Sequence, residues 1–227
     1  MSYEGLKISI LIPTKGKIFT KTVESVLAML SYNASIRLDT SIIFAEGTLV
    51  TTVRSRLVQE FMKKNCSHLC FIDSDMTFEP NYLQKLIDHK KSVVCGVAKV
   101  RGGKSWNIFT RDGVTGKYRP HAEVGDDLIE IDATGCACIM IEKSVIKEIL
   151  DTKTSATKDW SKLHEKYEGN MIVKETLFNL SKDRLLFNSI GEKSEDVLMC
   201  EYIKKCGYNI YADCSLKFGH INDIVIK

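Results

Sequence analysis

The 227-residue sequence lacks several features that would place it in a broad class of protein. No apolar run approaches the ~20 residues that a membrane-spanning helix needs. Internal repeats and low-complexity tracts are also missing. The formal net charge is only +3, with basic and acidic residues mixed along the chain, so no charged face indicates a nucleic-acid partner. We therefore expect a globular protein with no transmembrane segment and no affinity for nucleic acid.

The first residues and the cysteine spacing exclude two further classes. Residues 1–7 contain no basic stretch leading into an apolar one, so we expect no secretory signal and a cytoplasmic location. The eight cysteines are then expected to be thiols in a reducing compartment. Cys66 and Cys70 could form half of a metal site, but no second closely spaced pair accompanies them, which argues against structural zinc.

What the sequence does contain is an alternation of strand-like and helix-like segments over its first two-thirds, typical of an α/β fold. A hydrophobic fraction of 44% suits a sizeable core. Residues 151–187 are polar, rich in lysine and weakly periodic, which indicates an irregular lobe. Strands are predicted at 7–12, 41–44, 68–72, 92–97, 128–133, 137–141 and 209–212, and helices at 20–32, 50–64, 80–89, 143–150 and 194–206.

The strongest chemical signal is Asp73-Ser74-Asp75, directly after the apolar segment 68–72. Two carboxylates at this spacing, where a strand leaves a parallel sheet, lie in the crevice where α/β proteins bind ligands. Their oxygens suit Mg²⁺ or Mn²⁺, which would neutralise a bound phosphate. The motif therefore predicts a metal-assisted phosphate site.

One alternative is a phosphatase of the haloacid-dehalogenase type, since residues 73–77 match its DxDxT signature. Asp73 would then be the nucleophile and Asp75 the acid/base, with Thr134 as a further motif. Two features argue against it. That signature normally closes the first strand of its domain, and here a strand–helix–strand–helix segment precedes it. Met76 also stands where the family has glycine.

Six segments in order resemble the GT-A glycosyltransferases, particularly the compact family-2-like enzymes of bacteria and viruses. The resemblance runs over residues 8–221, apart from 151–187. Two segments depart from the pattern, with Val53 and Ser55 in the second, and Ala137 and Cys138 in the fourth. The segments are Ile10-Leu11-Ile12-Pro13-Thr14, Val53-Arg54-Ser55-Arg56-Leu57, Asp73-Ser74-Asp75, Asp132-Ala133-Thr134-Gly135-Cys136-Ala137-Cys138, Ser194-Glu195-Asp196 and Gly219-His220.

This resemblance implies a single GT-A domain over 1–227, with a mainly parallel central sheet flanked by helices. The nucleotide-binding half would be about 1–98, and the acceptor half about 126–227 with a variable lobe at 151–190. The implied activity is transfer of a sugar from a UDP- or GDP-sugar to an acceptor hydroxyl. The acceptor could be a glycan, lipid or protein, and neither it nor the oligomeric state is predicted.

The resemblance also implies a metal site. Asp75 would be the direct ligand, and Asp73 would lie near the ribose or reach the ion through water. His220 would add a nitrogen, which favours Mn²⁺ over Mg²⁺. The cation would stabilise the charge of the nucleoside diphosphate as it leaves. Pro13, Thr14 and Ser74 would contact the nucleotide.

Catalysis in an inverting member of the family would need a base for the acceptor hydroxyl. The resemblance gives this role to Asp196, with Glu195 as the alternative. A retaining mechanism stays open, because retaining members also have a terminal histidine ligand. An inactive sugar-nucleotide-binding module and a nucleotidyltransferase are further alternatives. The latter would need a basic Gly-rich loop after the first strand, and Thr14-Lys15-Gly16 is a poor version of one.

Three weaker candidates complete the predicted site. Arg54 would offer a positive fork to a phosphate or base, or would be an exposed helix residue. Glu46 would meet the edge of the nucleotide base. Trp106, in the Gly-rich basic segment 99–107, would stack on the donor sugar, or the segment would be an ordinary surface loop.

Overall fold

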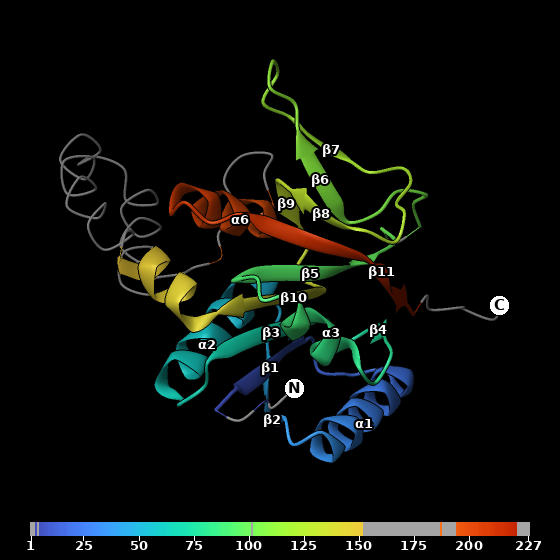
Figure 1. Ribbon diagram of the computed structural model, residues 1–227, viewed down its shortest axis with the longest axis vertical. Helices are drawn as coiled ribbons and strands as arrows, with labels where there is room; N and C mark the ends of the chain where they lie inside the picture. Colours follow the sequence, from blue (N-terminus) through green and yellow to red (C-terminus); the bar gives the residue numbers. More distant parts are fainter. Residues whose placement is uncertain (1–2, 4, 101, 152–186, 188–193, 222–227) are drawn as a thin grey trace.

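The computed structural model describes residues 3, 5–100, 102–151, 187 and 194–221, and Figure 1 shows its elements. An eight-stranded central sheet has the order β2-β1-β3-β10-β5-β11-β4, with β8 also paired to β11. A smaller sheet has the order β7-β6-β9. The strands are β1 Lys7–Thr14, β2 Asp39–Glu46, β3 His68–Ile72, β4 Met76–Thr77, β5 Val93–Ala98, β6 Ile108–Arg111, β7 Tyr118–Pro120, β8 Leu128–Ile131, β9 Ala133–Thr134, β10 Cys138–Glu142 and β11 Ile210–His220. The helices are α1 Thr20–Ser35, α2 Val50–Lys63, α3 Tyr82–Asp88 and α6 Glu195–Lys205, and residues 143–151 are also helical.

The central sheet is mainly parallel, as predicted. Strand β1 pairs in parallel with β2 and β3, and β11 pairs in parallel with β5. Strand β10 lies antiparallel between β3 and β5, so β5 runs in the same direction as β3. The carboxyl ends of β1, β2, β3 and β5 therefore meet at one edge of the sheet.

The core lies on both faces of this sheet, because successive side chains of a buried strand point to opposite faces. In β3, Leu69 and Phe71 belong to one buried cluster, and Cys70 and Ile72 belong to the other. The first cluster includes the inward faces of α2 and α6, and the second includes those of α1 and α3. Helices thus flank the sheet on both sides and leave its carboxyl edge for the site.

Several of the predicted elements differ in the structure. The predicted strand 128–133 is divided at Asp132 into β8 and β9, which belong to different sheets. Helix α3 begins at Tyr82, so Pro80 precedes it. Residues 108–120, for which no element was predicted, contain β6 and β7; β6 pairs with both β7 and β9. The predicted lobe 151–190 falls almost entirely outside the described residues.

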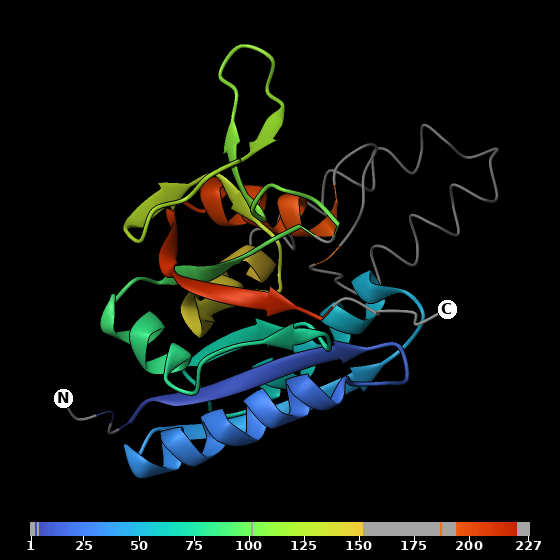
Figure 2. The same cartoon turned by 90° about the vertical axis from the view of Figure 1, so that its right-hand side faces the viewer.

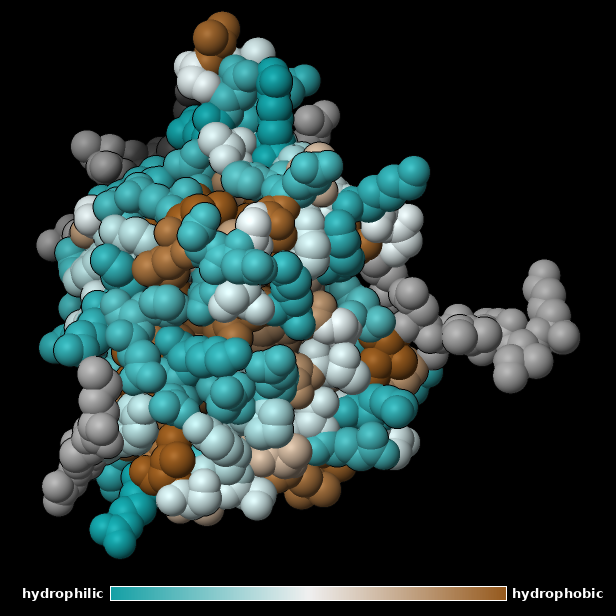
Figure 3. Space-filling model, turned by 45° about the vertical axis from the view of Figure 1, so that its right-hand side comes forward, coloured by the Kyte–Doolittle hydropathy of each residue, from teal (hydrophilic) through white to brown (hydrophobic). Residues whose placement is uncertain are grey.

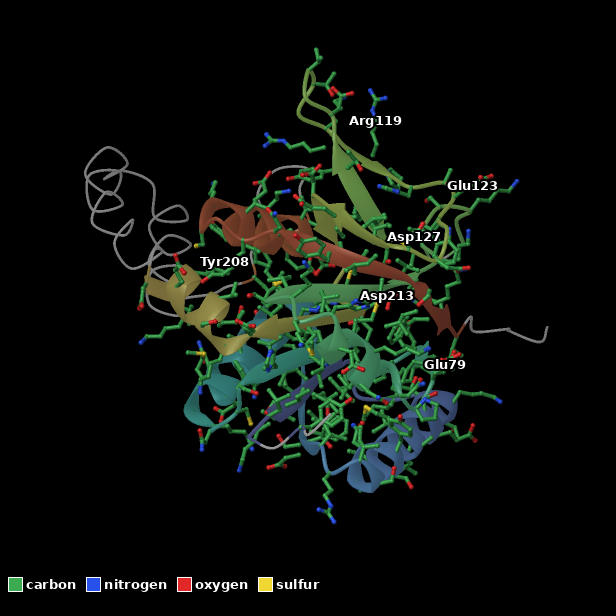
Figure 4. All side chains as sticks on the ribbon, viewed as in Figure 1. Glu79, Arg119, Glu123, Asp127, Tyr208 and Asp213 are labelled. Atoms are coloured by element: carbon green, nitrogen blue, oxygen red, sulfur yellow. The ribbon has the colours of Figure 1, made fainter. Side chains whose placement is uncertain are left out.

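The difference at the last strand matters most for the site. A last strand was predicted at 209–212, but β11 runs for 11 residues to His220. Tyr208, Asp213 and Glu79 mark its path in Figure 4, from its beginning, along its length, to the neighbourhood of β4. Its first residues lie between β8 and β5, its register against β5 shifts between Ala212 and Lys217, and its last two residues pair with β4.

The hairpin of β6 and β7 projects from the rest of the described chain (Figure 2). Its tip carries Val114, which is 98% exposed. The face drawn in Figure 3 is mostly hydrophilic, with hydrophobic residues in small separate groups. Over the residues that the structure describes, no helix is both long and apolar enough to cross a membrane.

Candidate active site

A cavity of about 370 Å³ lies at the carboxyl edge of the central sheet. This is the position at which open α/β sheets bind their ligands. The turn after β1, the start of α2, the turn after β3 and the start of α6 surround it. Most of the predicted site residues line the cavity: Pro13, Thr14, Arg54, Asp73, Ser74, Asp75, Glu195 and Asp196.

The Asp73-Ser74-Asp75 turn is fixed through its backbone from two sides. The Ser74 carbonyl accepts hydrogen bonds from the Phe19 N–H at 3.1 Å and from the Thr22 hydroxyl at 3.1 Å, both near the start of α1. The Asp75 carbonyl accepts one from the Ile221 N–H at 2.9 Å. The start of α1 and the residue after β11 therefore hold this turn in place.

Arg54 is the centre of the charged network in this cavity. The residue is 4% exposed. Its Nη2 donates to Asp73 Oδ1 at 2.8 Å, and its Nη1 donates to Glu195 Oε1 at 2.9 Å and Asp196 Oδ1 at 2.6 Å. Burial alone would lower the pKa of Arg54, but the adjacent carboxylates, Asp73 foremost, raise it above its ordinary value. Arg54 is thus a buried, permanently charged partner of three acids rather than an exposed helix residue.

Asp196 and Glu195 form the first turn of α6, after the N-cap residue Ser194. The positive end of a helix dipole stabilises carboxylates at this position. Burial raises the pKa of Asp196; Arg54 opposes this shift, and the neighbouring Glu195 adds to it. Asp196 Oδ2 lies beside Gly135, 3.6 Å from the point where a Cβ on that glycine would sit. A raised pKa is what a carboxylate needs in order to accept a proton near neutral pH.

His220 reaches the same region from β11. In the short antiparallel pair of β4 and β11, His220 lies opposite Met76, the residue after Asp75. Its Nδ1 lies 2.7 Å from the Lys99 carbonyl oxygen. A carbonyl can only accept, so Nδ1 carries the proton and Nε2 keeps its lone pair. This is the arrangement by which a carbonyl orients a metal-binding histidine.

The donor chemistry of Asp75 and His220 fits a divalent cation, but the three predicted ligands do not converge. Among the residues that the structure describes, no group of three His, Cys, Asp or Glu side chains is close enough to hold an ion. Asp73 Oδ1 is bonded to Arg54. A cation here would thus have to take part of its coordination from a bound ligand or water, as Mg²⁺ commonly does.

Two further predicted residues do not line the cavity. Glu46 is the last residue of β2, opposite Thr14. Its Oε1 lies 3.3 Å from where a Cβ added to Gly16 would sit. Trp106 packs against the core cluster on the α2 side, with the Lys99 ammonium 4.1 Å from its ring centre. In this conformation, Trp106 is occupied by Lys99.

Sequence reasoning missed several residues that line the cavity. Lys15 and Lys17 follow β1 in the turn at Gly16, which has a φ of 93° and so needs glycine. Phe19 and Val50 supply apolar surface. The spacing Lys15-Gly16-Lys17 directly after a buried strand was the available signal.

Comparisons with known proteins concern the fold. Neither a scan against protein-family models nor a search of curated proteins finds a match. Among solved structures, A197 from STIV matches with a TM-score of 0.56 and 16% identity, over 96% of this chain and 87% of that one. GalNAc-T7 with UDP, GalNAc and Mn²⁺ matches with a TM-score of 0.55 and 12% identity over 96% of this chain.

A third structure completes the comparison. A Drosophila β1,4-galactosyltransferase 7 mutant, in complex with manganese, UDP-Gal and xylobiose, matches with a TM-score of 0.52 and 11% identity, over 96% of this chain and 71% of that one. The chain has the GT-A fold. It spans only 44% of the length of GalNAc-T7. At these identities the likeness of the GT-A fold says nothing about individual residues.

Proposed function

We propose that this GT-A chain is a metal-dependent glycosyltransferase that uses a nucleoside diphosphate sugar as donor. The observation that carries the proposal is the cavity at the carboxyl edge of the sheet. It brings together the Asp73-Ser74-Asp75 turn and a candidate base, Asp196. Two structures of similar fold contain UDP with Mn²⁺, or UDP-Gal with manganese.

The charges of the cavity support a donor that brings its own cation. Four carboxylates line it, at positions 73, 75, 195 and 196, against three cations at 15, 17 and 54. The formal balance is negative, so a bare diphosphate would be repelled from the acidic side. A divalent ion held by Asp75 and His220 would reverse that balance and stabilise the charge that develops on the leaving diphosphate.

The opposite side of the cavity suits the diphosphate and the nucleoside. Lys15 and Lys17 offer positive charge at its edge. Helix α2 begins at Val50, beside the cavity, without a side-chain cap. Its N-terminal N–H groups are an environment that favours phosphate. Phe19 and Val50 would cover the apolar face of the base.

Asp196 is proposed as the base that deprotonates the acceptor hydroxyl, with Glu195 in support, and the sugar is transferred with inversion. Asp196 has the raised pKa that this role favours. Arg54 holds Oδ1 at 2.6 Å, while Oδ2 faces Gly135. One oxygen is thereby held by Arg54, and the other lies next to a residue without a side chain.

A thermal-shift panel of nucleotide sugars with Mn²⁺ tests the donor. A ligand at 100 times its dissociation constant should stabilise the protein by about 2.7 kcal/mol. Asp75→Ala should abolish the Mn²⁺-dependent part of this shift, because it removes the direct ligand. Glu123→Ala is the matched control, since Glu123 is exposed and lies away from α2 and β3 in Figure 4. Undiminished shifts in Asp75→Ala would refute the metal assignment.

The basic turn at Lys15 and Lys17 favours a second candidate, a nucleotidyltransferase. Such an enzyme would release pyrophosphate from a nucleoside triphosphate and a sugar 1-phosphate, whereas a glycosyltransferase would release a nucleoside diphosphate. Product analysis with each substrate pair separates the two reactions. The same series tests the phosphatase alternative. If the protein hydrolyses an aryl phosphate and Asp73→Asn does not, the proposed glycosyltransferase activity is wrong.

A further inference from the structure

The guanidinium of Arg54 binds acids from segments that are far apart in the sequence. Among the described residues, it donates hydrogen bonds to three carboxylates, one on the turn after β3 and two on α6. These partners lie 19, 141 and 142 residues away along the chain. In the described part of the chain its buried Nε has no hydrogen-bond partner. On another side lies the fully buried ring of Phe187, with its centre 6.0 Å from Cζ.

This arrangement solves an electrostatic problem. Carboxylates gathered in a partly buried cavity repel one another, and each loses hydration. A guanidinium has a rigid fork of donors that can bind two of them on one side and a third on the other. Without a metal ion, the acids of the cavity still need a positive charge beside them, and Arg54 provides it.

Arg54 and a divalent ion would share Asp73, one of the predicted metal ligands, and the other acids bound to Arg54 lie in the same cavity. Asp73 Oδ1 and Asp196 Oδ1 both bond to the guanidinium. An oxygen that donates electron density to an adjacent cation is a weaker ligand for a second one. Without another ligand, the ion would have too few side chains to bind, because no group of three His, Cys, Asp or Glu side chains among the described residues could hold it.

We propose that Arg54 is a positioning residue that acts as the internal counter-ion of the metal-free cavity, holds Asp73, Glu195 and Asp196 together, and keeps the affinity for a bare divalent ion low. The ion then binds well only when the diphosphate adds its own oxygens. The inference rests on the proposed use of a metal. Its test, however, needs neither a nucleotide nor an acceptor.

The test is titration of the free protein with Mn²⁺, followed by electron paramagnetic resonance. Arg54→Gln removes the competing charge and should bind Mn²⁺ about tenfold more tightly than the parent, because a positive charge a few ångströms from the acids repels a second cation. Arg54→Lys keeps the charge and should stay within about threefold of the parent. Arg56→Gln is the control, because Arg56 is exposed, lies outside the cavity lining, and donates to the Glu46 carbonyl at 3.4 Å.

A second comparison guards against misfolding, because removal of one partner from a buried ion pair is strongly destabilising. The double variant Arg54→Gln/Glu195→Gln loses one charge of each sign, so the net charge of the cavity is unchanged. It should bind Mn²⁺ more tightly than Glu195→Gln alone. Circular dichroism confirms that each variant is folded.

Affinity that stays equal or falls in both comparisons, including the case in which no variant binds Mn²⁺, overturns the inference. A merely structural role for Arg54 predicts that outcome, because a distorted cavity binds the ion less well. If the protein transfers no sugar, the proposed function is refuted, but the Mn²⁺ titration still tests the role of Arg54. A failed titration would leave the turnover assays unaffected.

Discussion

Substituting Gly219 with alanine should disrupt the placement of His220 through a single steric contact. A Cβ at Gly219 would lie 2.4 Å from Thr77 Oγ1, about 1 Å closer than an ordinary contact. Relief requires either a shift of β11 away from β4 or a rotation of Thr77 that breaks its 3.3 Å hydrogen bond to the Gly219 carbonyl. Overpacking of this kind costs about 1–3 kcal/mol. Because His220 is the next residue, Mn²⁺-dependent nucleotide binding should weaken about fivefold to a hundredfold.

The contact also defines the controls. Gly113→Ala, at a glycine with nothing within 4 Å of the added Cβ, should change neither stability nor binding. Thr77→Ala removes the hydroxyl, so the double variant Gly219→Ala/Thr77→Ala should recover most of the binding lost in the single variant. Calorimetric titration with nucleoside diphosphate and Mn²⁺ gives the affinities, and denaturant unfolding gives the stability. Unchanged affinity in Gly219→Ala, or no recovery in the double variant, would refute the steric argument.

Four further predictions concern the cavity and the helix α6 that carries its candidate base. Asp196→Asn should lower turnover roughly 10²–10⁴-fold with donor affinity nearly unchanged, and Glu195→Gln should cost less; the reverse ranking moves the base to Glu195. Since only the ionised form accepts a proton and the fold raises the pKa of Asp196, turnover should be lost with falling pH at a pH above the ordinary aspartate range. Lys17→Gln should weaken binding of a nucleoside diphosphate about threefold to tenfold but leave the nucleoside unaffected. Lys21→Gln, outside the cavity lining, should change neither, and equal effects would remove Lys17 from the site. Ser194→Ala should destabilise α6 by about 0.5–2 kcal/mol in urea unfolding, because Ser194 accepts from the Val197 N–H, and an unchanged midpoint would refute that cap.

Elements whose signals are local were predicted closely. Strand β3 has the predicted bounds, His68–Ile72, because an uninterrupted apolar run of that length ends at acidic residues. Helix α6 begins after Ser194 and ends before Gly207, which has a φ of 85°. Side chains that favour a cap or a left-handed backbone act within a few residues, so the sequence reveals them directly.

Elements that depend on distant partners were not predicted. The extension of β11 to His220 depends on pairing with β5 and β4, whose residues are more than a hundred positions earlier. Asp132 separates two strands because one neighbour pairs with β11 and the other with β6. A local pattern of alternating residues cannot show which strand lies next to which, and so it missed both the division and the extension.

The candidate site shows the same distinction. The sequence by itself identified the four acids of the cavity and placed them at the end of a strand and the start of a helix, because burial and helix capping leave marks in neighbouring residues. Only the tertiary structure decided that Arg54 binds those acids, that Lys15 and Lys17 line the same cavity, and that Trp106 packs with Lys99 outside it. Electrostatic and packing partners are chosen by distance in space, and the pairing of strands far apart in the chain sets that distance.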